Sequence, residues 1–168
     1  VFPSTTDPDA NAGAAWLQVH PDGRVAMLCP VHELGQGSSL ALAQIAAEEL
    51  GVDVADIDIK LPTTAEIPAM RFTTGSQSIA VHALPMARAA AALREELRRR
   101  AASQLGVDSA SLADGVAGFT LADGRTVPYR ELVRGSSVVL DVAALSDAPL
   151  YTFDPKRQRR QVGQPAMP

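Results

Sequence analysis

The sequence predicts an α+β domain of two layers, in which helices pack on a small mixed sheet. Three observations predict it: a β-β-α-β order near the start, one long helical pattern, and a second hairpin after that pattern. The chain has 168 residues, 46% of them apolar and 20% charged, which suffices for one domain with a real core. We expect this domain at 15–145, between an extended arm at 1–14 and a linker or tail at 146–168.

The opening unit is predicted from turn chemistry and from the spacing of apolar residues. Apolar stretches at 16–19 and 25–28 flank the turn sequence HPDGR, which is typical of a β-hairpin. A helix is expected from Ser38 to Leu50, before Gly51, because apolar residues recur there at spacings of three and four. Alternation at 57–61 then predicts a half-buried strand that ends at Pro62.

The second unit is predicted to contain a long helix after a loop from Pro62 to Gly75. One face of this helix carries Met86, Ala90, Leu93, Leu97 and Ala101. Pro85 should either kink the helix near Val81 or lie in the first turn of a fresh helix. The pairs Glu95 with Arg99 and Glu96 with Arg100 are expected to face solvent.

The remaining elements are short. Residues 118–127 predict a second hairpin, and residues 129–133 a short helix. Residues 138–144 are compatible with a strand or with a short helix, and we find no internal repeat. The basic run at 156–160 predicts a solvated connector, with a site for an acidic partner as the alternative.

Composition excludes several classes of function. A net charge of −4 and a pI near 5.3 provide no overall basic field for nucleic acid or an anionic membrane. The alanine run at 89–92 is far shorter than a membrane span needs, so no span is expected. The single cysteine, Cys29, is expected to be a buried and inert thiol, and we find no metal-ligand spacing, so no metal ligand is expected from this chain.

Two loops rich in Gly, Ser and Thr, at 33–39 and 73–78, each lead into a predicted helix. A helix N-terminus offers free N–H groups and a partial positive charge, so both loops could hold an anion. Each loop alone is more often only a helix cap, but the two together favour a phosphate-bearing ligand. Gln36 lies between two glycines, where its amide is expected to point outward unless it is only a polar turn residue. We find no nucleophile or general-base constellation in the sequence.

Three segments resemble a known family: DGRVAMLCPVHELGQGSSLALAQIAAEELGV, FTTGSQSIAVHALPMARAAAALREELRRRAASQLGV and DGRTVPYRELV. They resemble the molybdenum-binding catalytic subunits of the xanthine oxidase and aldehyde oxidase family, in the branch typified by the β subunit of isoquinoline 1-oxidoreductase. The resemblance covers about residues 15–133 and corresponds to the N-terminal portion of such a subunit. It implies part of a molybdenum hydroxylase or aldehyde dehydrogenase that uses water to oxidise an aldehyde or an N-heterocycle.

The resemblance also implies roles for individual residues. Gln36 is expected beside the molybdenum as the catalytic residue, hydrogen-bonded to an oxygen on the metal, while Gly35 and Gly37 let the backbone pass the pterin. The second loop is expected to hold the molybdopterin cytosine dinucleotide near its phosphates. Its residues are Thr73, Thr74, Gly75, Ser76 and Ser78.

The resemblance further implies partners, because this chain lacks the region that carries the family's catalytic glutamate, a role that Glu33 does not fill. A larger molybdenum-binding chain with that glutamate and a small 2Fe-2S subunit are expected, with a cytochrome c subunit in some members. The start without methionine suggests processing, and the branch often uses twin-arginine export, so a periplasmic location is expected and a cytoplasmic one is the alternative. The rival interpretations are a non-catalytic anion-binding or assembly module and a self-sufficient small enzyme, which the missing acid-base groups disfavour.

Overall fold

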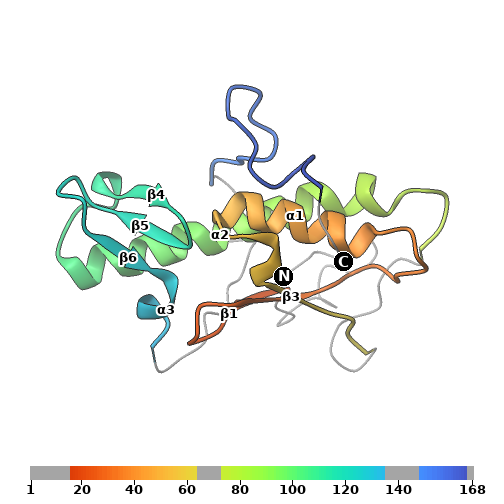
Figure 1. Cartoon of the computed structure of the whole chain (residues 1–168), viewed down its shortest axis with the longest axis horizontal. Helices are drawn as coiled ribbons and strands as arrows, with labels where there is room; N and C mark the ends of the chain where they lie inside the picture. The colour runs from red at the N-terminus through yellow and green to blue at the C-terminus, as the bar shows by residue number, and fades with distance from the viewer. Residues whose placement is uncertain (1–15, 64–72, 135–147, 166–168) are drawn as a thin grey trace.

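A computed structural model describes residues 16–63, 73–134 and 148–165. It contains two small sheets, two long helices side by side, and a C-terminal segment that lies against the helices (Figure 1). The predicted α+β class is therefore confirmed. The expected arm at 1–14 and the undecided element at 138–144 lie outside the described residues.

The first sheet is the mixed sheet that the sequence predicts. It has the order β1 (Leu17–Val19), β2 (Val25–Leu28), β3 (Ile57–Lys60), with an antiparallel pair followed by a parallel pair. The hairpin closes through a bond from the N–H of His20 to the carbonyl of Arg24 at 2.9 Å, and Gly23 takes a φ of +94° in the turn. Helix α1 (Ser38–Leu50) makes the crossover between the parallel strands.

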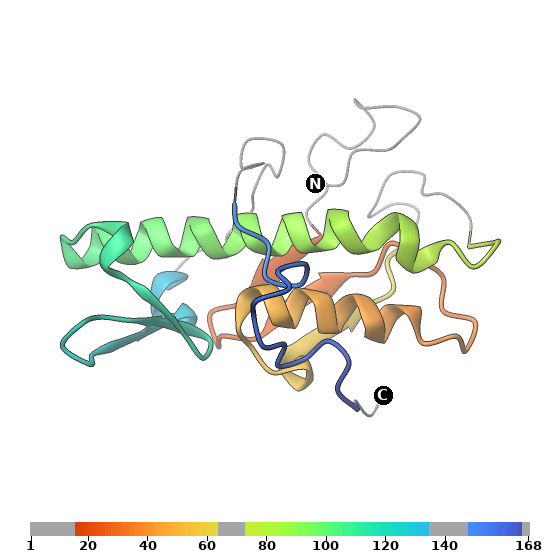
Figure 2. The same cartoon turned by 90° about the horizontal axis from the view of Figure 1, so that it is seen from above.

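The two long helices cover one face of this sheet. Figure 2 shows α1 and α2 (Ser78–Leu105) side by side, and small side chains such as Ala43, Ala46 and Ala90 are fully buried along them. The predicted apolar face of α2 is confirmed, since its five residues are all buried. The fresh helix considered at Pro85 is wrong, because α2 is one helix from Ser78 onward with Pro85 inside it. Burial of Met86 and Ala87 beside the proline stabilises the helix where the proline lacks its N–H.

The charges of α2 only partly follow the prediction. Glu96 pairs with Arg100 at 2.9 Å as expected, but Glu95 pairs with Arg94 and Arg98 instead of Arg99. Glu96 is only 8% exposed, so its expected position in solvent is wrong. Arg98 lies over the ring of Phe119, so the second sheet covers part of a helix surface that the charge pattern predicts to be solvated.

The second sheet packs near the end of α2 and is antiparallel. It consists of β4 (Ala113–Gly115), β5 (Gly118–Thr120) and β6 (Thr126–Pro128), followed by α3 (Tyr129–Leu132), which confirms the predicted hairpin and short helix. The sequence does not predict strand β4, because its residues, ADG, have no alternation. The hydroxyl of Tyr129 donates to the carbonyl of Leu50 at 2.8 Å and ties this sheet to the end of α1.

One local design occurs twice, although the sequence shows no repeat of longer range. After α1, Gly51 ends the helix at φ +66° and Asp53 caps the short 3₁₀ helix η1 (Val54–Asp56) before β3. After α2, Gly106 ends the helix at φ +66° and Asp108 caps η2 (Ser109–Ser111) before β4. The same four residues, LGVD, end both helices. The glycine adopts a left-handed conformation that stops the helix, and the aspartate caps the next turn.

The C-terminal segment 148–165 is attached to the domain. The side chain of Gln44 on α1 donates to the carbonyls of Gln161 and Gln164, at 3.2 and 2.8 Å. Buried Glu48 and Glu49 on the same helix accept backbone N–H groups from the segment. The basic run at 156–160 is largely exposed, as expected, but helix side chains bind the backbone on both sides of it, so the segment is not a free connector.

Candidate functional site

The first of the two predicted loops is organised around the carboxylate of Glu33. Its Oε1 accepts the N–H groups of Gly35 and Gly37, both at 2.9 Å, and its Oε2 accepts the N–H and hydroxyl of Ser39 at 3.1 and 2.7 Å. The Ser39 hydroxyl and these N–H groups lower the pKa of Glu33 to about 2. The anion predicted at the start of α1 is therefore the chain's own carboxylate, which fills the donors of the loop.

The sequence leads us to expect that the amide of Gln36 points freely outward. In the structure this amide is instead held by hydrogen bonds. Its Nε2 donates to the carbonyl of His32 at 2.8 Å and to the hydroxyl of Ser38 at 2.7 Å, while its Oε1 accepts the N–H of Leu34 at 2.6 Å. The residue is exposed, but its amide is bonded within its own loop. Positive φ values of +95° at Gly35 and +70° at Gly37 allow the backbone to curl around it.

The second predicted loop carries two consecutive residues with positive φ. Gly75 has a φ of +61° and Ser76 a φ of +54°, a conformation that residues other than glycine rarely adopt. The loop turns into α2 through a bond from the N–H of Gln77 to the carbonyl of Thr74 at 3.2 Å. The first turn of α2 contains no acidic residue, and its N–H groups have no acceptor within the helix.

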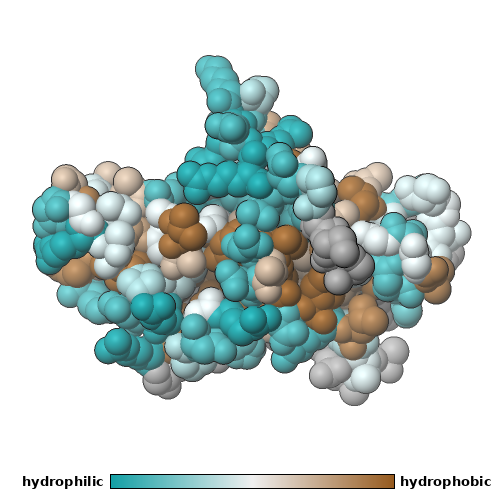
Figure 3. All heavy atoms as spheres, in the orientation of Figure 1, coloured by the Kyte–Doolittle hydropathy of each residue, from teal (hydrophilic) through white to brown (hydrophobic). Residues whose placement is uncertain are grey.

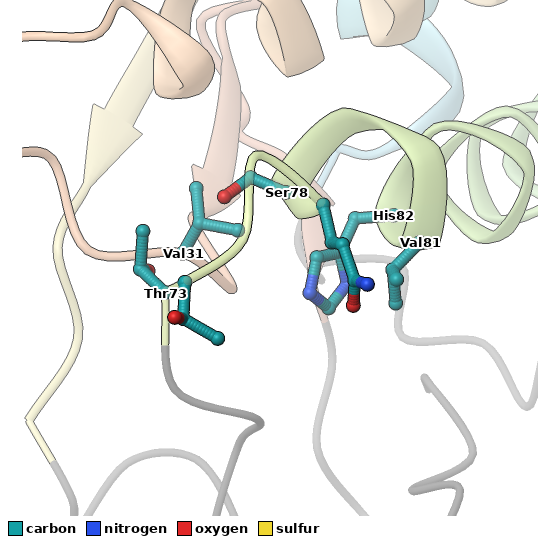
Figure 4. Close-up of a pocket in the computed structure, with 7 residues that line it drawn as sticks. Val31, Thr73, Ser78, Val81 and His82 are labelled. Atoms are coloured by element: carbon teal, nitrogen blue, oxygen red, sulfur yellow. The ribbon is translucent and has the colours of Figure 1, made fainter.

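The two loops are joined directly. The N–H of His32, directly before the first loop, donates to Oγ1 of Thr73, in the second, at 3.0 Å. A pocket opens beside this bond, and Figure 4 shows side chains of Val31, of the second loop and of α2 around it. Its lining consists of Val31, Thr73, Thr74, Gln77, Ser78, Val81 and His82. These residues supply hydroxyl, amide and imidazole groups and no carboxylate, so the pocket suits an anion better than a cation.

The structure brings together some of the site residues that the sequence predicts and leaves others apart. Thr73, Thr74 and Ser78 line the pocket, but Gly75 and Ser76 only shape the loop, and Gly35 to Gly37 lie outside the lining. The sequence analysis missed His82, which is 7% exposed and whose ring lies tilted against that of Trp16 with centroids 6.0 Å apart. Its position four residues after Ser78 places both on one helix face, which is the signal that could have found it.

Other chemistry is limited in the described part of the chain. Cys29 is 2% exposed, and burial raises the pKa of its thiol, so the expected buried cysteine is confirmed. Among the described residues no group of three or more His, Cys, Asp or Glu could hold a metal ion. No helix in the described ranges has the length and apolar character that a membrane crossing requires.

Comparison with known proteins identifies the family. The sequence model of the molybdopterin cofactor-binding domain matches residues 1–167. The chain belongs to this family. The resemblance to molybdenum-binding subunits of the xanthine oxidase family is thereby confirmed.

The individual relatives are all much longer than this chain. A nicotinate dehydrogenase subunit of Pseudomonas putida is 32% identical over 144 residues, which are 86% of this chain and 12% of that protein. The isoquinoline 1-oxidoreductase β subunit of Brevundimonas diminuta is 46% identical over 50 residues, 30% of this chain and 6% of that protein. A CO dehydrogenase structure from Oligotropha carboxidovorans superposes with a TM-score of 0.62 at 29% identity, over 70% of this chain and 15% of that one.

Proposed function

We propose that this molybdopterin-binding domain forms one wall of the dinucleotide cofactor site in a molybdenum hydroxylase or aldehyde dehydrogenase. The whole enzyme uses water to oxidise an aldehyde or an N-heterocycle. The observation that carries the proposal is the bond between His32 and Thr73, because it holds the backbone just before the Gly-Gln-Gly loop against the hydroxyl-rich loop that lines the pocket. The chain spans only 12% of its nicotinate dehydrogenase relative, so the catalytic activity belongs to the larger assembly.

The pocket residues fit an anionic group such as a phosphate. The pocket combines three hydroxyl groups with the N-terminus of a 28-residue helix, and none of its described lining residues is a carboxylate. The first loop offers no such fit, because Glu33 already occupies its N–H groups. We therefore assign the phosphates to the second loop alone. Thr73, Thr74 and Ser78 donate hydroxyl hydrogen bonds, and Gly75 and Ser76 set the shape of the turn.

Gln36 serves as the residue directed toward the reacting end of the cofactor. In this structure the two Nε2 hydrogens are both used within the loop, so the amide must exchange at least one of these bonds to donate to a ligand. Gly35 and Gly37 favour this rearrangement, because glycine moves between positive and negative φ at little cost and both residues have positive φ here. The bound cofactor supplies the two-electron redox chemistry, and the protein orients it and excludes competing contacts.

Further features of the proposal concern the assembly. We propose the cytosine dinucleotide form of the cofactor, a chain region or partner that carries the catalytic glutamate, and a small 2Fe-2S subunit, with a cytochrome c as a further electron acceptor. The nicotinate dehydrogenase and isoquinoline 1-oxidoreductase relatives are each named as one subunit of an enzyme, which supports a multi-subunit assembly. We propose a periplasmic location for this assembly.

A non-catalytic anion-binding or assembly module is the second candidate. The specific observation in its favour is that Glu33 fills the first loop and that the amide of Gln36 is bonded inside it. In this alternative the pocket at α2 holds an anion, and the first loop has only a structural role.

Metal and nucleotide analysis of the complete native enzyme separates the two candidates. The proposed function requires molybdenum and a released cytosine nucleotide in equal amounts, while the assembly module requires neither. In the loaded enzyme, Gln36→Ala should lower turnover far more than molybdenum content. Thr74→Ala combined with Ser78→Ala should instead lower the cofactor content itself. If Gln36→Ala lost metal and activity in equal proportion, it would be wrong to assign turnover to the first loop and cofactor binding to the second.

A further inference from the structure

The segment 148–165, which we call the strap, is held at two places by adjacent buried glutamates. Glu48 Oε2 accepts the N–H groups of Arg160, Gln161 and Val162 at 2.8, 2.6 and 3.3 Å. The two carboxylate oxygens of Glu49 accept the N–H of Tyr151 at 2.9 Å and that of Thr152 at 2.7 Å. These glutamates are 4% and 0% exposed, so both anchors lie in a low-dielectric environment.

Tyr151 adds a clamp at the first anchor. Its ring lies between two guanidinium groups, with Cζ of Arg94 at 3.6 Å and Cζ of Arg157 at 3.5 Å from the centroid. Its hydroxyl donates to Asp114 on β4. Arg94 also binds Glu49 at 3.1 Å, so the clamp, the anchor and the second sheet form one network.

From Phe153 to Arg160, whose N–H is the first group of the second anchor, the strap forms a loop that projects from the body of the molecule. Figure 1 shows this loop standing away from α1, and Figure 3 shows the same projection as a hydrophilic protrusion. Lys156, Arg159 and Arg160 are exposed, and within the described residues none of them takes part in an ion pair. Phe153 stands at the base of the loop with 49% exposure.

We propose that residues 153–160 are a docking loop for an acidic surface of a partner subunit. A connector needs no buried anchors, whereas a loop fixed at both ends loses little conformational freedom when it binds. Arginine and exposed aromatic side chains are the residue types that protein interfaces favour. Four cations against the single carboxylate of Asp154 give the loop a positive charge on a chain whose net charge is −4. This contrast selects an acidic partner and steers its approach.

A protein partner fits the loop better than nucleic acid or an anionic membrane. Three exposed cations on one short loop neutralise few phosphates, and the negative charge of the remaining chain opposes an extended polyanion. The exposed ring of Phe153 offers apolar area that a protein surface can bury. The inference rests on the proposed function only in that it requires a multi-subunit assembly.

The test uses the complete enzyme with its partner subunits and reads association instead of turnover. The variant is Lys156→Glu with Arg159→Glu, and the matched control is Arg24→Glu with Arg130→Glu, two exposed arginines on the β1–β2 turn and on α3. We expect the dissociation constant of the assembly to rise about tenfold or more for the loop variant and to change less than about twofold for the control. Carbodiimide treatment of the unmodified assembly should join Lys156 to an aspartate or glutamate of a partner subunit.

Three results would overturn the inference. They are an unchanged dissociation constant for the loop variant, cross-links from Lys156 only within its own chain, and loss of binding to phosphatidylglycerol vesicles without any change in subunit association. Molybdenum content, measured on the same preparations, keeps the two proposals separate. Weakened association in an assembly that contains no molybdenum would support the docking loop and contradict the proposed function.

Discussion

The backbone N–H of His32 donates to Oγ1 of Thr73 at 3.0 Å and thereby joins two loops that are 41 residues apart in sequence. One loop leads into α1 and the other into α2, so this bond links the two chain segments that precede the helix N-termini. The pocket that we assign to the cofactor lies beside it. Four features of the structure can be tested by substitution. They are this bond, the Glu33 carboxylate, the buried ion pair and the second sheet.

Removal of the Thr73 hydroxyl should uncouple the loops. Thr73→Val keeps the shape of the side chain but removes the acceptor, and should lower the free energy of unfolding by about 0.5–1 kcal/mol, because the bond is partly solvated. Hydrogen exchange at the amide of His32 should become faster in Thr73→Val, and Thr73→Ser should restore it. Unchanged exchange in the valine variant would show that the bond does not couple the loops.

Acid should open the first loop through Glu33. The pKa of this carboxyl is lowered from 4.5 to about 2 in the folded chain, so the unfolded chain binds the proton more tightly. The stabilisation is therefore complete above pH 4.5 and is lost as the pH falls toward about 2. Amide chemical shifts of Gly35, Gly37 and Ser39 should report this titration. Glu33→Gln should abolish it, whereas Glu131→Gln on α3 should leave it intact.

The buried pair of Arg94 and Glu49 should be costly to break. Their side chains are 1% and 0% exposed, and Arg94→Met leaves the Glu49 carboxylate without its cation. We expect the free energy of unfolding to fall by about 3–5 kcal/mol. Urea denaturation should show a smaller loss for Arg94→Met with Glu49→Gln than the sum of the single variants. Arg99→Met, at a side chain that is 73% exposed, serves as the control and should change stability by less than about 0.5 kcal/mol.

Two neighbouring residues of the second sheet should respond in opposite directions. A Cβ on Gly118 would lie 2.4 Å from the carbonyl oxygen of Val127, so Gly118→Ala should destabilise the domain by about 1–3 kcal/mol. Ala117 already has a φ of +48°, which glycine adopts without strain, so Ala117→Gly should be neutral or stabilising. Thermal unfolding of the two variants checks both signs. A lower midpoint for Ala117→Gly than for Gly118→Ala would contradict this assignment.

The candidate site is predictable where its chemistry is local. Thr73, Thr74 and Ser78 are expected to face a ligand because hydroxyls gather before a helix start, and all three line the pocket. The role of Glu33 is not predictable in this way, since its carboxylate folds back on residues two to six positions ahead in a loop whose shape depends on positive φ at glycine. The contribution of His82 also depends on how α2 lies against Trp16.

The sequence by itself determined the fold class, the mixed first sheet, the buried face of α2, the second hairpin and the family. These features depend on the spacing of apolar residues, on turn residues and on short motifs, all of which act over a few neighbouring positions. Only the tertiary structure decided that Glu48 and Glu49 hold a segment more than 100 residues away, and that the two loops meet at His32 and Thr73. A buried carboxylate must find hydrogen-bond donors, but the path of the whole chain decides which backbone supplies them.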